Sequence, residues 1–431
     1  MSEKKSLNQI AWEEIFKTHD VLNKISTDGE FIINASEIKR FREPRLMSKF
    51  DNEINLPKIF KDHKLAILPI SRSSYIISHF EAYHKFEAPD DSNIATINFP
   101  IPDHIQSLDF ANITSEAIAL NCALAAGIIT DFVGDMPLIP TVSGRMSSKS
   151  FDFNINNTYK NTPHSVSVNN SQIEIDAAYE CPHCLAIFEA KRDISTDLLI
   201  RQLYYPYRLW KNTISKPVKP FFLTYSNGIF RLYEFAFEDI NNYNSLILIK
   251  QKKYSVENTI IELNDIEDVL RRTALVKEQS IPFPQANSFE RVINLCELLN
   301  DKELNHDDIT VEYAFDSRQT DYYTNAAKYL GLLERVNDTP ETPYNLTDLG
   351  KRILSLSYKQ RQLAFCSQIL SHKAFNEVLK LHLEISRMPS TAMIVKIMKK
   401  ANLHNIHSDN TYERRSSTIK SWVNWILSLI S

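Results

Sequence analysis

The chain has 431 residues, of which 43% are hydrophobic and 24% are charged. This balance is typical of a globular protein and excludes an extended disordered chain, and the length predicts two or three domains. No apolar run approaches the roughly 20 residues of a membrane-spanning helix, and the amino-terminal segment lacks the apolar core of a secretory signal. Five cysteines, an odd number, do not indicate a disulfide framework, so we expect a cytoplasmic protein without a membrane partner.

The net charge of −4 argues against a surface covered with phosphate-binding groups, but the charge is unevenly distributed. Residues 351–431 contain 13 Lys and Arg and 4 Asp and Glu, a net charge of +9. Residues 287–350 contain 5 Lys and Arg and 13 Asp and Glu, a net charge of −8. Such polarity favours orientation on a polyanion, and an accidental grouping of solvated helix faces is the alternative.

Taken in chain order, the apolar pattern first predicts a helix over residues 7–25, followed by a basic stretch at 38–50. Strand-like runs follow at 65–70 and 74–86, and residues 115–131 predict one buried helix. Basic side chains in and after these segments offer charge for phosphate groups. They are Arg42, Arg45, Lys49, Arg72 and Arg145.

From residue 171 the apolar pattern changes to a period of two, which is typical of β-strands. Glu174 and Asp176 share one face of the first predicted strand, and Glu189 and Lys191 share one face of the second. Residues 181–184 supply a turn, so we expect the two strands to form a hairpin on which Asp176, Glu189 and Lys191 converge. A helix is then predicted over 193–211, and Asn-Gly at 227–228 predicts a further hairpin.

Hydrolysis of a phosphodiester needs a bound metal ion, an activated water and stabilisation of charge on the leaving oxygen. Mg²⁺ prefers oxygen ligands and is usually held by one or two carboxylates, with water and phosphate oxygens completing its coordination. Asp176 and Glu189 could hold such an ion, and Lys191 could orient or deprotonate the attacking water. Glu174, on the same strand face, is the alternative metal ligand. A charged end of an apolar strand at the protein surface would produce the same pattern without any catalysis.

This arrangement resembles the PD-(D/E)xK nuclease superfamily. The matching residues are Asp176, Glu189 and Lys191. The resemblance implies an α/β fold with a mixed-sheet nuclease core that cuts duplex DNA with Mg²⁺, for which Mn²⁺ can substitute. It also implies an acidic residue on a preceding helix and a glutamine on a following helix, and Glu116 and Gln202 match these two positions. The sequence departs from the motif at Ile175, where a proline would precede Asp176.

Segments at 42–51, 67–83 and 141–153 are similar to a group of type II restriction endonucleases, and this resemblance covers most of residues 35–285. It implies sequence-specific cleavage of double-stranded DNA by a homodimer, with a cognate DNA methyltransferase as genetic partner. One alternative is a modification-dependent or repair nuclease with the same active site. The other is a DNA-binding regulator with an inert nuclease core, which the intact catalytic set disfavours.

Residues 280–288 read as a linker, and the chain beyond them is predicted to be all-α. Residues 309–336 are typical of a winged helix that is interrupted at 316–317, with a wing over 335–347. Its second helix carries residue types that contact bases and phosphates, namely Arg318, Gln319 and Tyr322. Because this unit is acidic, a role in packing or dimerisation is the alternative.

The last unit, about residues 387–430, carries a cluster of basic residues on one predicted helix. We expect Arg414, Arg415 and Lys420 to contact phosphates, with Trp422 and Trp425 on the rear face of the helix. An amphipathic terminal helix with solvated basic residues is the alternative. The sequence thus predicts four parts: an N-terminal helical segment (1–34), a nuclease core (35–285), a winged-helix-like unit (286–350) and a basic helical DNA-binding unit (351–431).

Cys181 and Cys184 form a Cys-x-x-Cys pair within the predicted hairpin turn. Structural zinc needs four ligands, and the sequence contains no second pair of this kind, so a zinc site is disfavoured. The remaining cysteines are scattered, and we expect them to be buried as small apolar side chains. They are Cys122, Cys296 and Cys366.

Overall fold

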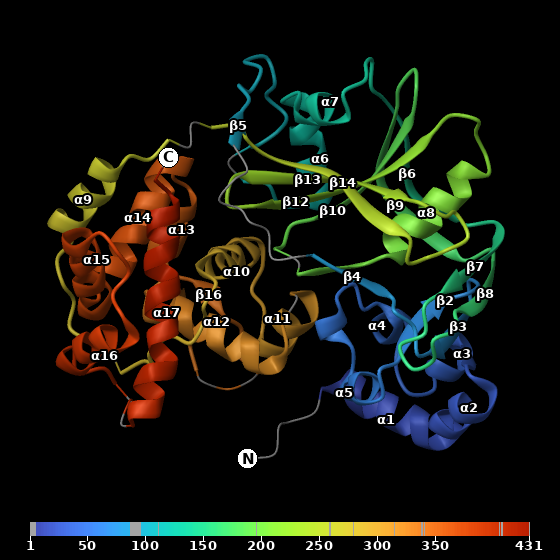
Figure 1. The fold of residues 1–431 in the computed structure, drawn as a ribbon, viewed down its shortest axis with the longest axis horizontal. Coiled ribbons are helices and arrows are strands. Elements are labelled where there is room, and N and C mark those ends of the chain that lie inside the picture. Colours follow the sequence, from blue (N-terminus) through green and yellow to red (C-terminus); the bar gives the residue numbers. More distant parts are fainter. Residues whose placement is uncertain are drawn as a thin grey trace. The chain divides into compact units, whose positions relative to one another are not determined.

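A computed structural model describes residues 6–86, 96–110, 112–194, 196–257, 260–278, 280–313, 315–337, 339, 341–404, 406 and 408–430. The chain forms two compact units. Unit 1 comprises residues 1–90, 115–224 and 230–253, and unit 2 comprises residues 91–114, 225–229 and 254–431. The fold is mixed α/β, as predicted, with a seven-stranded mixed sheet (Figure 1). In the described part of the chain, no helix has the length and apolar character needed to cross a membrane.

The seven-stranded sheet has the strand order β5-β14-β13-β12-β10-β9-β6. Strand β10 (Leu185–Lys191) pairs antiparallel with β9 (Gln172–Glu180) and parallel with β12 (Val218–Ser226). The predicted hairpin over residues 171–191 is therefore confirmed. The other strands of this sheet are β5 (Thr96–Asn98), β6 (Ile139–Ser147), β13 (Ile229–Phe237) and β14 (Leu246–Ser255).

Strand β10 is buried along nearly its whole length because side chains pack against both of its faces. On one face, the ring of Phe188 stacks on Phe221 at 4.8 Å, and Phe132 of helix α7 (Ile128–Val133) packs against Phe221. On the other face, Ile187 shares a core cluster with Leu203 of helix α8 (Arg201–Lys211). Side chains at the end of β10 thus lie at the border of a well-packed core.

Three predicted helices differ from the structure. Residues 7–25 form two helices, α1 (Leu7–His19) and α2 (Val21–Asp28), because Asp20 between them has a left-handed φ of 51°. Residues 115–131 form α6 (Glu116–Ala125) and α7, separated at Gly127 with φ 78°, a conformation that ends helices. The helix predicted over 193–211 begins only at Arg201. The residues before it form strand β11 (Asp197–Leu199), which pairs with β4 (Tyr83–Lys85), and residue 195 lies outside the described residues.

The first part of unit 1 is a three-stranded sheet, β1-β3-β2, with helices α1 to α5 gathered around it (Figure 1). Trp12, Phe16 and Phe60 form its aromatic centre, with Phe60 4.8 Å from Trp12 and 5.2 Å from Phe16 between ring centroids. A separate hairpin is formed by β7 and β8. The remaining elements of unit 1 are β1 (Phe31–Asn34), α3 (Ala35–Ile38), α4 (Pro44–Ser48), η1 (Glu53–Asn55), α5 (Lys58–Asp62), β2 (Ala66–Pro69), β3 (Ser74–Ser78), β7 (Ser150–Ile155) and β8 (His164–Asn169).

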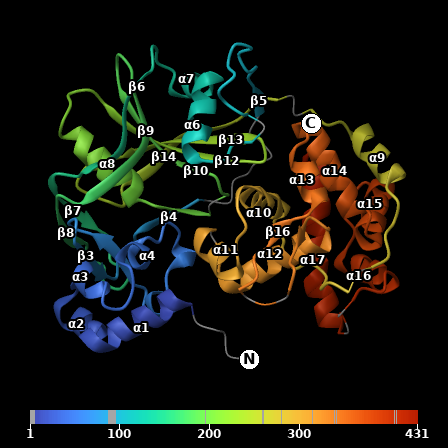
Figure 2. The ribbon, with the colours of Figure 1, turned by 180° about the vertical axis from the view of Figure 1, so that it is seen from behind.

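Unit 2 is mainly helical, as predicted for the chain beyond the linker. Helices α15, α16 and α17 lie side by side (Figures 1 and 2). The predicted rear face of α17 is confirmed: Trp422 and Trp425 are buried, and the Trp422 indole donates to the Ala286 carbonyl at 2.7 Å. The helices of unit 2 are α9 (Leu263–Arg272), α10 (Phe289–Asp301), α11 (His306–Glu312), α12 (Ser317–Tyr329), α13 (Asp348–Leu354), α14 (Tyr358–Leu370), α15 (Lys373–Ile385), α16 (Thr391–Lys400) and α17 (Asp409–Ser428).

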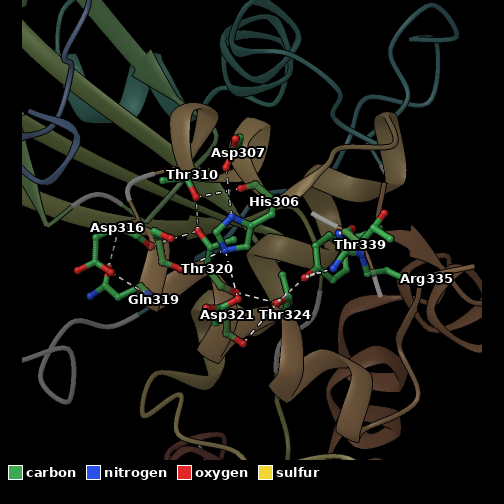
Figure 3. Close-up of polar contacts among 12 residues, drawn as sticks. His306, Asp307, Thr310, Asp316, Gln319, Thr320, Asp321, Thr324, Arg335 and Thr339 are labelled. Carbon is green, nitrogen blue, oxygen red and sulfur yellow. Dashed lines mark hydrogen bonds and ion pairs between the residues drawn. The ribbon is translucent and has the colours of Figure 1, made fainter. Parts of the chain in front are cut away.

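Helices α11 and α12 are joined by polar contacts (Figure 3). The Thr310 and Thr320 hydroxyls lie 2.7 Å apart, and the His306 imidazole lies 3.2 Å from the Asp321 carboxylate. The predicted interruption at 316–317 is the start of α12, where the Asp316 side chain accepts from the backbone N–H of residue 319.

A short hairpin follows α12. Its strands are β15 (Leu333–Glu334) and β16 (Asn345–Leu346), and an isolated bridge joins Leu304 to Tyr344 beside it. Arg335 closes the connection by donating to the Thr342 carbonyl at 3.0 Å and lying over the Tyr344 ring. This hairpin coincides with the predicted wing, of which residues 338 and 340 lie outside the described residues.

Candidate active site

Glu189 and Lys191 lie at the end of β10, and their side chains meet. The Lys191 ammonium donates to Glu189 Oε1 at 2.6 Å. On the neighbouring strand, Asp176 accepts a hydrogen bond of 2.8 Å from the backbone N–H of Ala190, which fixes its carboxylate beside the Glu-x-Lys segment. The structure therefore places Asp176 on the strand beside the Glu189–Lys191 pair.

The two competing acids on β9 have different surroundings. Glu174 is exposed and lies 3.3 Å from the Arg145 guanidinium on strand β6. Asp176 is mostly buried and faces Glu189 and Lys191. Both acids lie on the same face of β9, but only Asp176 lies beside the Glu-x-Lys segment, whereas Glu174 forms a solvent-exposed ion pair, which favours Asp176 as the carboxylate of the site.

Two further predicted residues enter the cluster from helix starts. Glu116 is the first residue of α6, and its carboxylate lies 3.6 Å from the Lys191 ammonium. Gln202, in the first turn of α8, donates to Glu189 Oε1, the oxygen that Lys191 also contacts. The structure therefore brings together all five predicted catalytic residues.

Sequence reasoning missed Asp51, which lies 3.9 Å from the Lys191 ammonium. Its neighbour Asn52 anchors the segment: the Asn52 amide donates to the Asp197 carboxylate at 2.9 Å, and the Glu53 N–H donates to the same carboxylate at 3.2 Å. Both Asn52 and Asp197 are buried. Asp51 is thereby held against β10, although the basic stretch before it drew attention only to positive charges.

The cluster contains more negative than positive side chains, and its ionisation reflects this. Burial raises the pKa of Glu189 to about 8, although Lys191 acts in the opposite direction. Burial also raises the pKa of Asp176 and of Glu116. Burial opposes the charge of Lys191, but the surrounding carboxylates, Glu189 foremost, raise its pKa well above the usual value. Lys191 is therefore an ammonium ion at neutral pH.

Asp51 differs from the other acids of the cluster. Burial acts to raise its pKa, but the ammonium groups of Lys191 and Lys49 outweigh burial, so its pKa is lowered. Its Oδ1 atom is buried and has no hydrogen-bond partner among the described residues, and the same is true of Gln202 Oε1. A small divalent cation such as Mg²⁺ binds carboxylate and amide oxygens of this kind. Its positive charge would also favour the ionised form of the neighbouring acids, whose pKa values burial raises. Asp176, Glu189 and Asp51 would hold the cation after moving closer together, because their carboxylate oxygens do not all lie within 4.8 Å of one another.

The raised pKa of Glu189 leads to a testable dependence of stability on pH. The unfolded chain loses this proton near the ordinary value of 4.5, whereas the folded protein keeps it to about 8. The contribution of this buried proton to the free energy of unfolding is therefore complete below pH 4.5, the pKa of the unfolded chain. It is lost as pH rises through about 8, the pKa in the folded protein. We expect the melting temperature of metal-free protein to fall between about pH 5 and pH 8.5, and Glu189→Gln to flatten this fall. Equal pH dependence in wild type and variant would contradict the assignment.

The basic residues predicted for DNA contact in unit 1 are distributed around this site. Lys49 lies 3.5 Å from Asp51, so it borders the cluster. Arg45 and Arg72 are exposed, and Arg42 is half-buried. Arg145 is engaged with Glu174. Among these five, the structure brings only Lys49 directly to the candidate active site.

In unit 2, the residues of α12 and α17 that were predicted to contact DNA interact through a hydrogen bond and through their charges. Arg318 donates to the Tyr322 hydroxyl at 2.5 Å, and Tyr322 acts electrostatically on Arg415 of α17. Burial and the adjacent Arg414 lower the pKa of Arg415. Arg318 and Arg414 are exposed, and we call the side chains of Arg318, Tyr322, Arg414 and Arg415 together the α12–α17 surface.

Two predicted contact residues are placed differently. The Gln319 side chain belongs to the capping box of α12, in which its Oε1 accepts from the Asp316 N–H. Lys420 is exposed and lies further along α17 than Arg414 and Arg415. Gln319 thus has a structural role at the helix start, while Lys420 is a further exposed positive charge on α17.

Three family models match the chain, and each is described as a domain of unknown function. Domain of unknown function (DUF6996) matches residues 9–77, domain of unknown function (DUF6997) matches residues 78–255, and domain of unknown function (DUF7226) matches residues 291–431. No curated protein and no solved structure matches the chain. The candidate active site draws on the first two matched regions, because Asp51 lies in 9–77 and the other members lie in 78–255.

Proposed function

We propose that the protein is a Mg²⁺-dependent endonuclease that hydrolyses duplex DNA at a specific sequence, as type II restriction enzymes do. The proposal rests on the buried cluster of Asp176, Glu189 and Lys191. Glu116 and Gln202, at the starts of two helices, complete this cluster. This set has the composition of a PD-(D/E)xK site, and its oxygen donors suit Mg²⁺.

In the proposed reaction, Asp176, Glu189 and Asp51 would hold the cation, which would supply polarisation of the scissile phosphate and activation of the attacking water. Lys191 carries its proton at neutral pH, so it orients the attacking water and stabilises negative charge on the phosphate rather than removing a proton. Gln202 holds the Glu189 carboxylate in place through its hydrogen bond.

We assign DNA binding to unit 2. The order of α10, the Leu304 bridge, α11, α12 and the β15–β16 hairpin fits a winged helix, in which α12 would be the reading helix. The α12–α17 surface supplies arginines for phosphate contact although residues 287–350 are acidic overall. A homodimer would match a symmetric target site, and a cognate DNA methyltransferase would protect the host.

The experiment that tests this function is incubation of the full chain with unmethylated phage DNA and Mg²⁺. Discrete fragments are the expected result. Fragments obtained only from methylated DNA would favour the modification-dependent nuclease, and binding without any cleavage would favour the regulator with an inert core. Either of these two results would overturn the restriction assignment.

The assignment of the metal-binding acid on β9 makes a separate prediction. Asp176→Asn removes a buried carboxylate of the cluster, so we expect cleavage to fall by about 100-fold or more. Glu174→Gln breaks only an exposed ion pair with Arg145, and such pairs contribute little, so cleavage should stay within about twofold of wild type. Cleavage rates of the two variants on the same DNA decide the matter, and the opposite ranking would move the site to Glu174.

The α12–α17 surface makes a prediction about salt dependence. If Arg414 and Arg415 contact phosphates, changing either to Ala should weaken binding to all DNA sequences and lower the slope of log affinity against log salt by about one. The matched control is Arg272→Ala, because Arg272 is an exposed arginine of α9 that pairs with Asp268. This variant should leave the slope unchanged. Loss confined to the cognate site would instead indicate base reading. Unchanged affinity and slope in both variants would remove this surface from the DNA interface.

A further inference from the structure

The turn between β9 and β10 contains two buried thiols, and a carboxylate from a distant part of the sequence points to them. Cys181 and Cys184 are both buried, with their sulfurs 2.7 Å apart. Asp135 lies just after α7, and a carboxylate oxygen of Asp135 lies within 4.8 Å of both sulfurs. Within the described residues, these form the one group of three or more such donors whose ligand atoms all lie within 4.8 Å of one another.

We propose that Asp135, Cys181 and Cys184 bind one Zn²⁺ ion. Two thiolates and a carboxylate are a donor set that zinc accepts, and thiolates select it over Mg²⁺. Asp135 was not recognisable from the sequence as a partner of the Cys-x-x-Cys pair, because it belongs to a different segment, the one that joins α7 to β6.

The surroundings of Asp135 support a ligand role. Its carboxylate accepts from the backbone N–H of His183 at 3.1 Å and from that of Met136 at 2.9 Å, and the His183 ring nitrogen lies 3.2 Å away. Metal-binding carboxylates are held in place by hydrogen bonds of this kind. His183 is exposed on the same turn, so its imidazole is a donor available for a fourth ligand position.

Zinc binding requires a small local movement. Zinc–sulfur bonds of about 2.3 Å in a tetrahedral site separate two thiolates by about 3.8 Å. The sulfurs, now 2.7 Å apart, therefore move apart by about 1 Å. The ion would clamp the turn of the β9–β10 hairpin to the end of α7, which makes it a structural site at the opposite end of the hairpin from Glu189.

Metal analysis of the full chain, purified under reducing conditions, tests the proposal. We expect about one zinc per chain in wild type and in Cys122→Ala, the matched control for loss of a buried thiol. Cys181→Ala and Cys184→Ala should each hold less than about a tenth of this amount, and Asp135→Ala should bind zinc at least about tenfold more weakly. Zinc retained by both cysteine variants would overturn the proposal.

A second readout covers cysteine variants that fail to fold. Cobalt added to reduced, zinc-free wild type should produce the near-ultraviolet band of thiolate-to-cobalt charge transfer. The proposal would be overturned if the wild type showed neither this band nor bound zinc. It would also be overturned if the protein were isolated with a Cys181–Cys184 disulfide and took up no zinc after reduction. Glu189→Ala should keep its zinc, so the result is independent of whether the protein cuts DNA.

Discussion

Replacing Glu189 or Lys191 with Ala is expected to lower the rate of DNA cleavage by about 1000-fold or more while DNA affinity stays nearly unchanged. Glu189 is the centre of the buried cluster, because Lys191 and Gln202 both donate to its Oε1 atom. Its removal takes away a metal ligand, and removal of Lys191 takes away the positive charge that the carboxylates surround. The basic residues assigned to DNA binding are untouched in both variants.

Single-turnover kinetics measure the rate of DNA cleavage. Gel-shift titration in the presence of a chelator, which prevents cleavage, measures the DNA affinity separately. Glu238→Ala and Lys211→Ala are matched controls, because both residues are exposed and belong to unit 1. They should cut at the wild-type rate. Cleavage at the wild-type rate by the Glu189 and Lys191 variants would refute the active-site assignment.

Asp51→Asn is expected to reduce cleavage by about 10- to 100-fold, an effect that the sequence alone did not predict. The change keeps the shape of the side chain and removes a charge that lies 3.9 Å from the Lys191 ammonium. Because Asp51 Oδ1 has no hydrogen-bond partner among the described residues, we expect the loss to appear as a higher Mg²⁺ requirement.

The rate of cleavage measured against Mg²⁺ concentration provides this test. Asp62→Asn is the control, since Asp62 is an exposed acid of α5 that pairs with Lys58 one turn earlier in the same helix. A wild-type Mg²⁺ requirement in Asp51→Asn would exclude Asp51 from the metal site and leave it a purely structural neighbour of Lys191.

Local patterns predicted the parts of the site that lie close together in sequence. The alternation of residues 172–180 and 185–191 and the short turn between them sufficed to pair β9 with β10. The Asn227-Gly228 hairpin was predictable for the same reason, since both residues have positive φ, 53° and 76°. Glu116 and Gln202 came from the resemblance to a nuclease family, and the structure places both at the cluster.

Contacts between segments that are distant in the sequence could not be predicted from it. Asp51 reaches the site only because Asn52 bonds to Asp197, and neither residue carries a recognisable signal. Asp135 lies near Cys181 and Cys184 because α7, which it follows, packs against the sheet. The break of the first helix at Asp20 was equally hidden, because a left-handed φ at a residue other than glycine is uncommon.

Metal reversal on supercoiled plasmid DNA tests the central claim most directly. Wild-type protein with Mg²⁺ should linearise the plasmid, a chelator should stop the reaction, and excess Mg²⁺ should restore it, whereas Glu189→Ala should remain inactive throughout. Cleavage that continues in the chelator, or equal cleavage by Glu189→Ala, would contradict a Mg²⁺-dependent site built on this carboxylate.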